Sequence, residues 1–288
     1  MGPEDVRRVG VVGCGIMGSG IVEVVARTGA EVVFVEASEE LVDRGRRAIE
    51  RSTARAVERG KLGAEEREAL LGRVRGTTDL GELADVDLVI EAATEDLAVK
   101  REVFAALGRT VRPEVILASN TSSIPIAELA AASGRPDRVV GMHFFNPAPV
   151  MELLEVTPAL TTSEETLAFA RGYGERLGKT VVVARDEAGF IVNRLLVPYL
   201  NDAVRLLESG FASREDIDVA AKLGLAHPMG PLELLDLVGL DTHLRICEVL
   251  HAEFGEPRYA PPPLLRRMVT AGRLGRKSGR GFYEYASG

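Results

Sequence analysis

Short runs of β-branched residues alternate with longer amphipathic stretches through the first part of the chain. This alternation is typical of a parallel sheet covered by helices. The predicted strands are Val9–Val12, Glu31–Val35, Asp87–Glu91, Val115–Ala118, Arg138–His143, Leu153–Thr157 and Thr180–Ala184. The predicted helices are Ile16–Arg27, Glu39–Arg59, Leu97–Thr110, Ile126–Ser133 and Glu164–Leu177, with Ser38 and Ser163 as N-caps of the second and the last.

Strand signals stop after Ala184, and only helical patterns follow. Gly189–Ser209 predicts one long helix, and further helices are expected at Ser213, at Pro231, from about Asp241, and after the Pro-rich stretch Pro257–Pro263. The predicted buried stripe of the long helix contains Ile191, Leu195, Tyr199 and Val204. The sequence therefore predicts a Rossmann-type, doubly wound α/β domain over residues 1–184 and an all-α domain over residues 185–288.

The predicted all-α domain has many apolar positions for its length. Helical domains of this kind often bury surplus apolar surface against a second copy of themselves. We therefore expect a homodimer.

Composition narrows the classes of function. Apolar residues make up 46% of the chain and charged residues 27%, as in a globular protein with a substantial core. The formal net charge of −8 argues against nucleic acid as a partner, because phosphate neutralisation needs a basic surface. It does not exclude an anionic small molecule, since a few local lysines and arginines can bind one.

The two cysteines, Cys14 and Cys247, form no CxxC motif or His/Cys cluster, so we expect neither a disulfide framework nor a metal. The N-terminal run Val9–Val22 contains five glycines, which makes it poor material for a signal peptide or a membrane helix. These features predict a cytoplasmic protein without a membrane partner.

A GxGxxG motif, Gly13-Cys14-Gly15-Ile16-Met17-Gly18, lies between a predicted strand and a predicted helix. In such motifs the glycines allow a tight turn, close approach of a pyrophosphate, and close helix–strand packing. Glu36 follows Gly13 by 23 residues at the end of the second strand, where a carboxylate binds ribose hydroxyls and repels a 2′-phosphate. The alternative is a glycine-rich turn that binds no ligand, with Glu36 as a solvated residue. The motif and Glu36 together favour NAD binding.

Oxidation of an alcohol by NAD needs a base for the hydroxyl proton, and neutral histidine suits this role. Of the four histidines, His143 ends a predicted strand at the edge where α/β sheets bind ligands. The chain breaks at residues 146–149 and returns in an apolar run that contains Glu155. A reversal there would set Glu155 beside His143 and orient the imidazole. The alternatives are a buried structural histidine and an outward-facing glutamate.

Two polar clusters offer groups that could hydrogen-bond a substrate. Residues 119–123, Ser-Asn-Thr-Ser-Ser, follow a predicted strand at the same edge, and Asn193 lies in the first turns of the long helix. Serine and asparagine at such places could bind a carbonyl or a hydroxyl group. They could equally be N-cap residues and a surface asparagine.

Seven segments of the chain carry a family resemblance: GCGIMGSGI, VIEAATEDLAVK, ASNTSSI, HFFNPAPVMELLEV, DEAGFIVNRLL, HPMGPLELLDLVGLD and GRKSGRGFYEY. In these motifs and their order the chain closely resembles the L-3-hydroxyacyl-CoA dehydrogenase family. The resemblance implies NAD-dependent interconversion of L-3-hydroxyacyl-CoA and 3-oxoacyl-CoA, as in fatty-acid and butanoate metabolism, without a metal.

Carried over by position, the resemblance also implies roles for individual residues. His143 would be the general base and Glu155 its partner, while Ser122 and Asn193 would contact the substrate and support the site. The NAD pocket would be lined by the glycine loop, Glu36, Glu95, Lys100, Ser122, Asn146 and Lys277. For the CoA moiety, Ser52 matches the family's serine position, and Arg59 or Lys61 stands near its lysine position.

Two rival hypotheses remain open at this stage. One is a related dehydrogenase that acts on a sugar acid or on a hydroxyacyl group carried by a protein, because such relatives share the histidine–glutamate pair. The other is a non-catalytic NAD-binding protein that has kept the fold. The presence of His143, Glu155, Ser122 and Asn193 together argues against the second.

Overall fold

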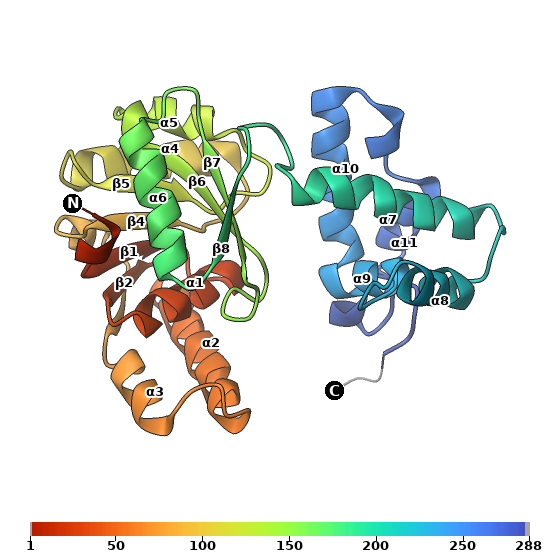
Figure 1. Ribbon diagram of the computed structural model, residues 1–288, viewed down its shortest axis with the longest axis horizontal. Helices are drawn as coiled ribbons and strands as arrows, with labels where there is room; N and C mark the ends of the chain where they lie inside the picture. The colour runs from red at the N-terminus through yellow and green to blue at the C-terminus, as the bar shows by residue number, and fades with distance from the viewer. Residues whose placement is uncertain (1, 286–288) are drawn as a thin grey trace. The chain divides into compact units, whose positions relative to one another are not determined.

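The chain forms two compact units, which divide between Glu187 and Ala188 (Figure 1). The computed structural model describes residues 2–285. The first unit contains all the named strands, and the second is helical. The predicted order, a Rossmann-type α/β domain followed by an all-α domain, is confirmed.

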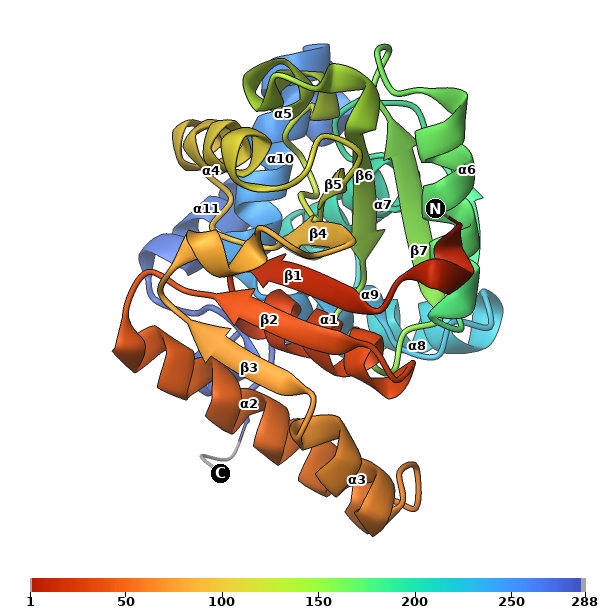
Figure 2. The same cartoon turned by 90° about the vertical axis from the view of Figure 1, so that its left-hand side faces the viewer.

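One eight-stranded sheet forms the centre of the first unit, in the order β3-β2-β1-β4-β5-β6-β7-β8. Figure 2 shows β3, β2 and β1 side by side. The strands are β1 Arg8–Val12, β2 Glu31–Val35, β3 Val74–Thr77, β4 Leu88–Glu91, β5 Ile116–Ser119, β6 Val139–Phe144, β7 Leu153–Pro158 and β8 Thr180–Val183. Neighbouring strands are parallel except β6 and β7, which are antiparallel. The carboxyl ends of β1 to β6 therefore share one edge of the sheet.

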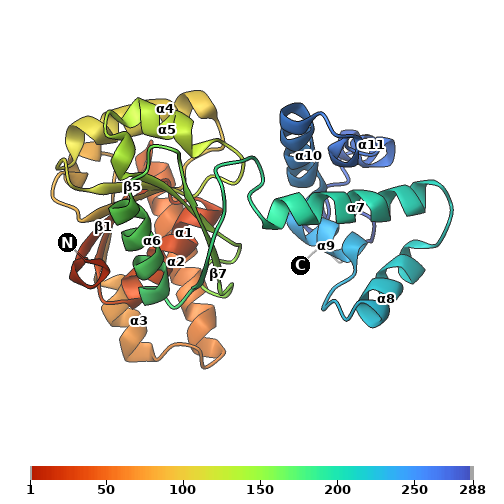
Figure 3. The ribbon, with the colours of Figure 1, turned by 45° about the horizontal axis from the view of Figure 1, so that its top comes forward.

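Six helices accompany this sheet: α1 Ile16–Arg27, α2 Glu39–Glu58, α3 Ala64–Leu71, α4 Leu97–Thr110, α5 Ile126–Ser133 and α6 Glu164–Arg176. Successive residues of a strand point to opposite faces, so each face has its own core. Helices α1 and α6 pack on one face, and α4 and α5 pack on the other, where Figure 3 shows them together.

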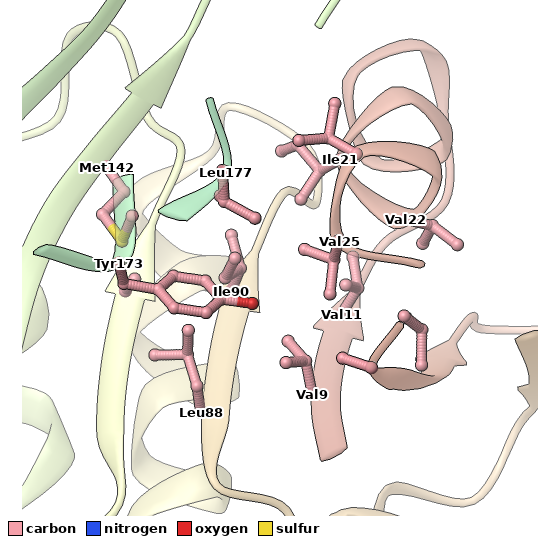
Figure 4. Packing of buried hydrophobic residues seen from close by; sticks show 14 of the residues in the cluster. Val9, Val11, Ile21, Val22, Val25, Leu88, Ile90, Met142, Tyr173 and Leu177 are labelled. Carbon is pink, nitrogen blue, oxygen red and sulfur yellow. The ribbon is translucent and has the colours of Figure 1, made fainter. Parts of the chain in front are cut away.

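The core on the α1 and α6 face is built from alternate strand residues. In β4, for example, Leu88 and Ile90 belong to this core, while Val89 between them belongs to the core on the other face. Figure 4 shows the cluster at close range. Its labelled residues are Val9, Val11, Leu88, Ile90 and Met142 from the strands, Ile21, Val22 and Val25 from α1, Tyr173 from α6, and Leu177 directly after α6. Such two-sided burial explains why these strands are almost continuously apolar.

All seven predicted strands are present with ends shifted by at most one residue, and three predicted helices, α1, α4 and α5, match residue for residue. The capping hydroxyls of Ser38 and Ser163 accept hydrogen bonds from Leu41 N and Thr166 N. The sequence analysis missed β3 and α3. Strand β3 is a partly exposed edge strand, and α3 buries only Leu70, so neither carries a strong apolar pattern.

The second unit contains α7 Val192–Glu208, α8 Arg214–Gly224, α9 Pro231–Val238, α10 Leu240–Phe254 and α11 Pro263–Thr270. The prediction that the long helix begins at Gly189 is wrong. Gly189 and Phe190 have φ angles of +77° and +45°, in the left-handed region, so a right-handed helix can begin only after them.

The predicted buried stripe of α7 is also wrong in part. Ile191 lies before the helix and is 39% exposed, and Leu195 is 72% exposed, whereas Val204 is buried as expected. The residues of α7 that are buried are Asn193, Val197, Leu200, Asn201, Ala203 and Val204. The polar Asn201 was missed because its buried partners, His243 and Cys247, come from α10.

No helix among residues 2–285 has the length and apolar character needed to cross a membrane.

Candidate active site

The glycine-rich loop joins the carboxyl end of β1 to the start of α1. Gly13 has a φ of +88°, and a Cβ atom there would lie 2.8 Å from the backbone of Ala93. A Cβ on Gly18 would lie 1.9 Å from the carbonyl oxygen of Gly13, so the helix can approach the strand only if this residue is glycine. A Cβ on Gly15, in contrast, would meet nothing within 4 Å.

Open space at Gly15 is what a phosphate-binding loop requires. No side chain caps the start of α1, so no protein group competes there for the first backbone N–H groups of the helix. Ile16 in the first turn is 78% exposed, while Met17 is partly buried against the core. The loop therefore fits the pyrophosphate of a dinucleotide.

Glu36 directly follows β2 and lies against this loop. Its Oε1 accepts a hydrogen bond of 2.5 Å from the backbone N–H of Cys14. Burial, followed by the charge of Glu36, raises the pKa of the Cys14 thiol to about 12. The carboxylate expected to bind ribose is thus placed beside the predicted pyrophosphate site.

His143 and Glu155 face each other across the antiparallel pair β6–β7. His143 Nδ1 lies 2.8 Å from Glu155 Oε2, and the histidine is 8% exposed while the glutamate is fully buried. The chain reversal between the strands therefore brings the two together, as predicted. Because a carboxylate accepts hydrogen bonds, Nδ1 carries the shared proton, and the lone pair of the neutral ring is then on Nε2.

A third group of residues follows β5. Glu95 Oε1 accepts hydrogen bonds from the side chain of Thr121 and from the backbone N–H groups of Ser122 and Ser123, at 2.6, 2.9 and 3.2 Å. Burial alone would raise the pKa of Glu95, but Lys100 and these donors outweigh it and hold the pKa below its usual value. Ser122 is thereby tied to Glu95.

Asn120, part of the polar cluster 119–123, has a structural role that the sequence did not predict. Its Oδ1 accepts a hydrogen bond of 2.9 Å from the backbone N–H of Phe144, the residue after His143. This bond joins the end of β5 to the end of β6. An asparagine directly after a strand at the ligand-binding edge was the signal that could have identified it.

The remaining predicted cofactor residues lie in different settings. Asn146 is exposed just after β6, whereas Lys100 is 1% exposed and its Nζ lies 2.5 Å from Glu91 Oε1. Lys277 belongs to the second unit, where its Nζ donates a hydrogen bond of 2.7 Å to Asp241 Oδ2. Asn193 is also in the second unit, buried in the first turn of α7.

The three predicted CoA-contact residues line one hollow of the first unit. Ser52, Arg59 and Lys61, from α2 and the turn after it, face a space of about 820 Å³. The basic side chains on its lining are Arg27, Arg55, Arg59, Lys61, Arg176 and Lys179. Glu23 and Glu152 also line it, so basic side chains are in excess, and the hollow is suited to an anionic ligand although the protein as a whole is acidic. Within residues 2–285, no three histidine, cysteine, aspartate or glutamate side chains are grouped as metal ligands.

Replacement of Gly15 by alanine separates dinucleotide binding from folding. The new methyl group has room in the protein, so we expect the melting temperature of Gly15→Ala to stay close to that of the wild type. The methyl would occupy the approach to the pyrophosphate and weaken NADH binding by about tenfold or more, or about 1.4 kcal/mol. Fluorescence titration with NADH measures this, and an unchanged Kd would contradict the assignment of the loop. Gly18→Ala, whose methyl overlaps Gly13, should instead lower the melting temperature.

Known proteins resemble both units of the chain. Residues 8–187 match the NAD binding domain of 3-hydroxyacyl-CoA dehydrogenase, and residues 189–285 match its C-terminal domain. A 3-hydroxybutyryl-CoA dehydrogenase of Mycobacterium tuberculosis is 55% identical over 98% of this chain and 99% of its own length.

Solved structures show the same likeness. The crystal structure of M. tuberculosis FadB2 superposes with a TM-score of 0.96 at 55% identity, covering 98% of this chain and 99% of that one. The (S)-3-hydroxybutyryl-CoA dehydrogenase PaaH1 of Ralstonia eutropha gives 0.93 at 45% identity, covering 98% and 100%. With both domains matched in order, the chain belongs to the 3-hydroxyacyl-CoA dehydrogenase family and is an NAD-dependent dehydrogenase.

Proposed function

We propose that the protein interconverts L-3-hydroxyacyl-CoA and 3-oxoacyl-CoA, with His143 as general base and Glu155 as its partner. The observation that carries this proposal is the buried 2.8 Å contact between His143 Nδ1 and Glu155 Oε2 at the carboxyl edge of the sheet. Relatives named 3-hydroxybutyryl-CoA dehydrogenase support a short acyl thioester as substrate. We place the activity in fatty-acid and butanoate metabolism, where such thioesters are intermediates.

The proton chemistry follows from the two ring nitrogens of His143. With Nδ1–H donated to Glu155, Nε2 holds the lone pair that takes the proton of the substrate's 3-hydroxyl group. The imidazolium formed is then stabilised by the adjacent carboxylate. Bound NAD supplies the chemistry of hydride acceptance in this direction and of hydride donation in the reverse. In the reverse direction the imidazolium returns the proton to the carbonyl oxygen.

Other residues would hold the two ligands. We assign Ser122 and Asn193 to the substrate, because their hydroxyl and amide groups can bind a carbonyl and a hydroxyl. For NAD we assign the residues Gly13, Cys14, Gly15, Ile16, Met17, Gly18, Glu36, Glu95, Lys100, Ser122, Asn146 and Lys277. The open glycine loop and the position of Glu36 beside it support the assignment in the first unit.

The basic hollow would take the nucleotide part of CoA. Ser52, Arg59 and Lys61 line it together with four more basic side chains, and phosphates are the groups that such a cluster binds best. Sugar acids have no phosphate of this kind, and a protein-bound phosphopantetheine has only one. The hollow therefore supports a CoA thioester over those alternatives.

Loss of the base tests the reaction directly. For reduction of acetoacetyl-CoA by NADH, we expect His143→Ala to lower kcat by about 10²- to 10⁴-fold, since it removes the proton-transfer group. Glu155→Gln keeps the shape of the side chain but removes its charge, and it should lower kcat by about tenfold to a hundredfold. His227→Ala, a change at an exposed histidine of the second unit, is the matched control and should keep full activity. Wild-type kcat in His143→Ala would exclude it as the base; an inactive wild type that still binds NADH would favour a non-CoA substrate.

A truncated substrate tests the hollow. We expect Arg59→Ala and Lys61→Ala each to raise KM for acetoacetyl-CoA several-fold, which corresponds to a loss of about 0.5–1.5 kcal/mol of binding free energy. Both variants should leave KM for acetoacetyl-pantetheine unchanged. The pantetheine thioester lacks the nucleotide phosphates, so neither substitution should weaken its binding. Arg109→Ala, at an exposed arginine of α4 outside the hollow, should alter neither value. Equal effects on both thioesters would place the nucleotide elsewhere.

We also propose a homodimer that covers apolar surface of the second unit. Phe211, Leu223 and Leu195 are 79%, 82% and 72% exposed in the single chain, which is unusual for such large apolar residues. Light scattering should give twice the 30.9 kDa of one chain. Leu223→Asp should shift the mass toward that of a monomer, because it places a charge in the contact. A monomeric wild type would refute the proposal.

A further inference from the structure

Lys100 is held inside the first unit between two carboxylates. Its side chain is 1% exposed, and its Nζ lies 2.5 Å from Glu91 Oε1 and 3.7 Å from Glu95 Oε2. A buried ammonium is costly unless it is paired, and here both partners come from the segment just before α4. With so little surface, Lys100 can act on a ligand chiefly through the groups that surround it.

Glu91 connects three segments at the carboxyl edge of the sheet. Fully buried at the end of β4, it accepts hydrogen bonds from Ala93 N–H and from the Ser119 hydroxyl, both at 2.7 Å, as well as from Lys100. Ala93 lies directly under the glycine loop, because a Cβ on Gly13 would approach its backbone to 2.8 Å. Glu91 therefore joins the floor of the glycine loop, the end of β5 and helix α4.

Glu95 connects Lys100 to the loop that contains Ser122. Its two oxygens have different partners: Oε2 faces Lys100, and Oε1 accepts from the loop after β5. The donors to Oε1 are the Thr121 hydroxyl, the Ser122 N–H and hydroxyl, and the Ser123 N–H and hydroxyl. This many donors within hydrogen-bond distance of one carboxylate oxygen favour the ionised form of Glu95.

We propose that Glu91 and Lys100 are positioning residues that hold Glu95 against the loop 121–123 and so keep Ser122 in place for the substrate. The inference rests on the proposed role of Ser122. It adds a second role for Lys100, which we assigned to the NAD pocket: support of Glu95 from behind. It also gives a function to Glu91, which has no place in the proposed chemistry itself.

The ionisation of Glu95 makes this arrangement testable. Lys100 on α4 is the charged group that faces it, with Glu91 of β4 on the far side of that lysine, while the loop after β5 offers neutral hydroxyl and amide donors. Burial raises the pKa of Glu95, and Lys100 acts against burial. Without Lys100 the pKa of Glu95 should rise, so the carboxylate that orders the loop would be lost as the pH falls.

The experiment is the pH profile of kcat/KM for reduction of acetoacetyl-CoA by NADH, from about pH 5 to pH 8. In this direction His143 donates a proton, so acid does not remove its active form. For Lys100→Met we expect a decline of about tenfold per pH unit below the raised pKa of Glu95, which the wild type lacks over the same range. In Lys100→Met/Glu95→Gln this decline should vanish, because glutamine does not titrate.

Arg101→Met is the matched control. Arg101 is the next residue of α4 and pairs with Glu128 on α5, but both side chains are largely exposed, so its loss should leave the profile unchanged. If Lys100→Met folds poorly, Glu91→Gln/Lys100→Met removes the stranded buried charge and should show the same decline. A wild-type profile in either Lys100 variant would overturn the inference.

Amide hydrogen exchange separates this inference from the proposed function. In the NADH-bound protein without thioester, the Ser122 and Ser123 amides should be protected in the wild type and in Arg101→Met. In Lys100→Met they should lose protection at the acid end, after correction for intrinsic rates. If the wild type fails to reduce acetoacetyl-CoA, the substrate proposal fails, and the exchange data alone decide the positioning role. Equal protection in all variants would overturn it.

Discussion

Parallel pairing from β3 through β6 directs the carboxyl ends of neighbouring strands to one edge of the sheet, and the chemistry of the first unit depends on this constraint. The glycine loop follows β1, Glu36 follows β2, Glu91 ends β4, and the serine loop follows β5. The single antiparallel step, from β6 to β7, then brings Glu155 back beside His143. A parallel β7 would have needed a long crossover connection after β6. A short reversal could not then have brought the two side chains together.

Features that depend on local spacing were predictable from the sequence. The glycine loop needs only a strand, a turn and a helix in order, and strong apolar periodicity located α1, α4 and α5 to the residue. The His143–Glu155 contact was also predictable, because the break at residues 146–149 between two apolar runs leaves little choice but a reversal. The assignment of roles within the polar loop required more: Ser122 stands among three other hydroxyl residues, and position in a family, rather than spacing, distinguished it.

What escaped prediction depends on tertiary contacts or on backbone conformations with weak signals. Strand β3 lies at an edge and is only partly buried, so its sequence carries little apolar alternation. Phe190 adopts a left-handed φ that few non-glycine residues take, and this moved the start of α7. The family resemblance placed Lys100 in the NAD pocket, but nothing in the sequence indicated that it is buried against Glu91. That pair is formed by the packing of β4 and α4.

Cys14 sits in the middle of the loop that would bind the cofactor, at a place where an oxidised or alkylated sulfur would obstruct the site. Its burial beneath α2, against Gly45, and its raised pKa keep it as a protonated thiol at neutral pH. Thiolates, not thiols, react with peroxide and with electrophiles. The same packing that closes the loop against α2 therefore also disfavours the thiolate, which is the reactive form of Cys14.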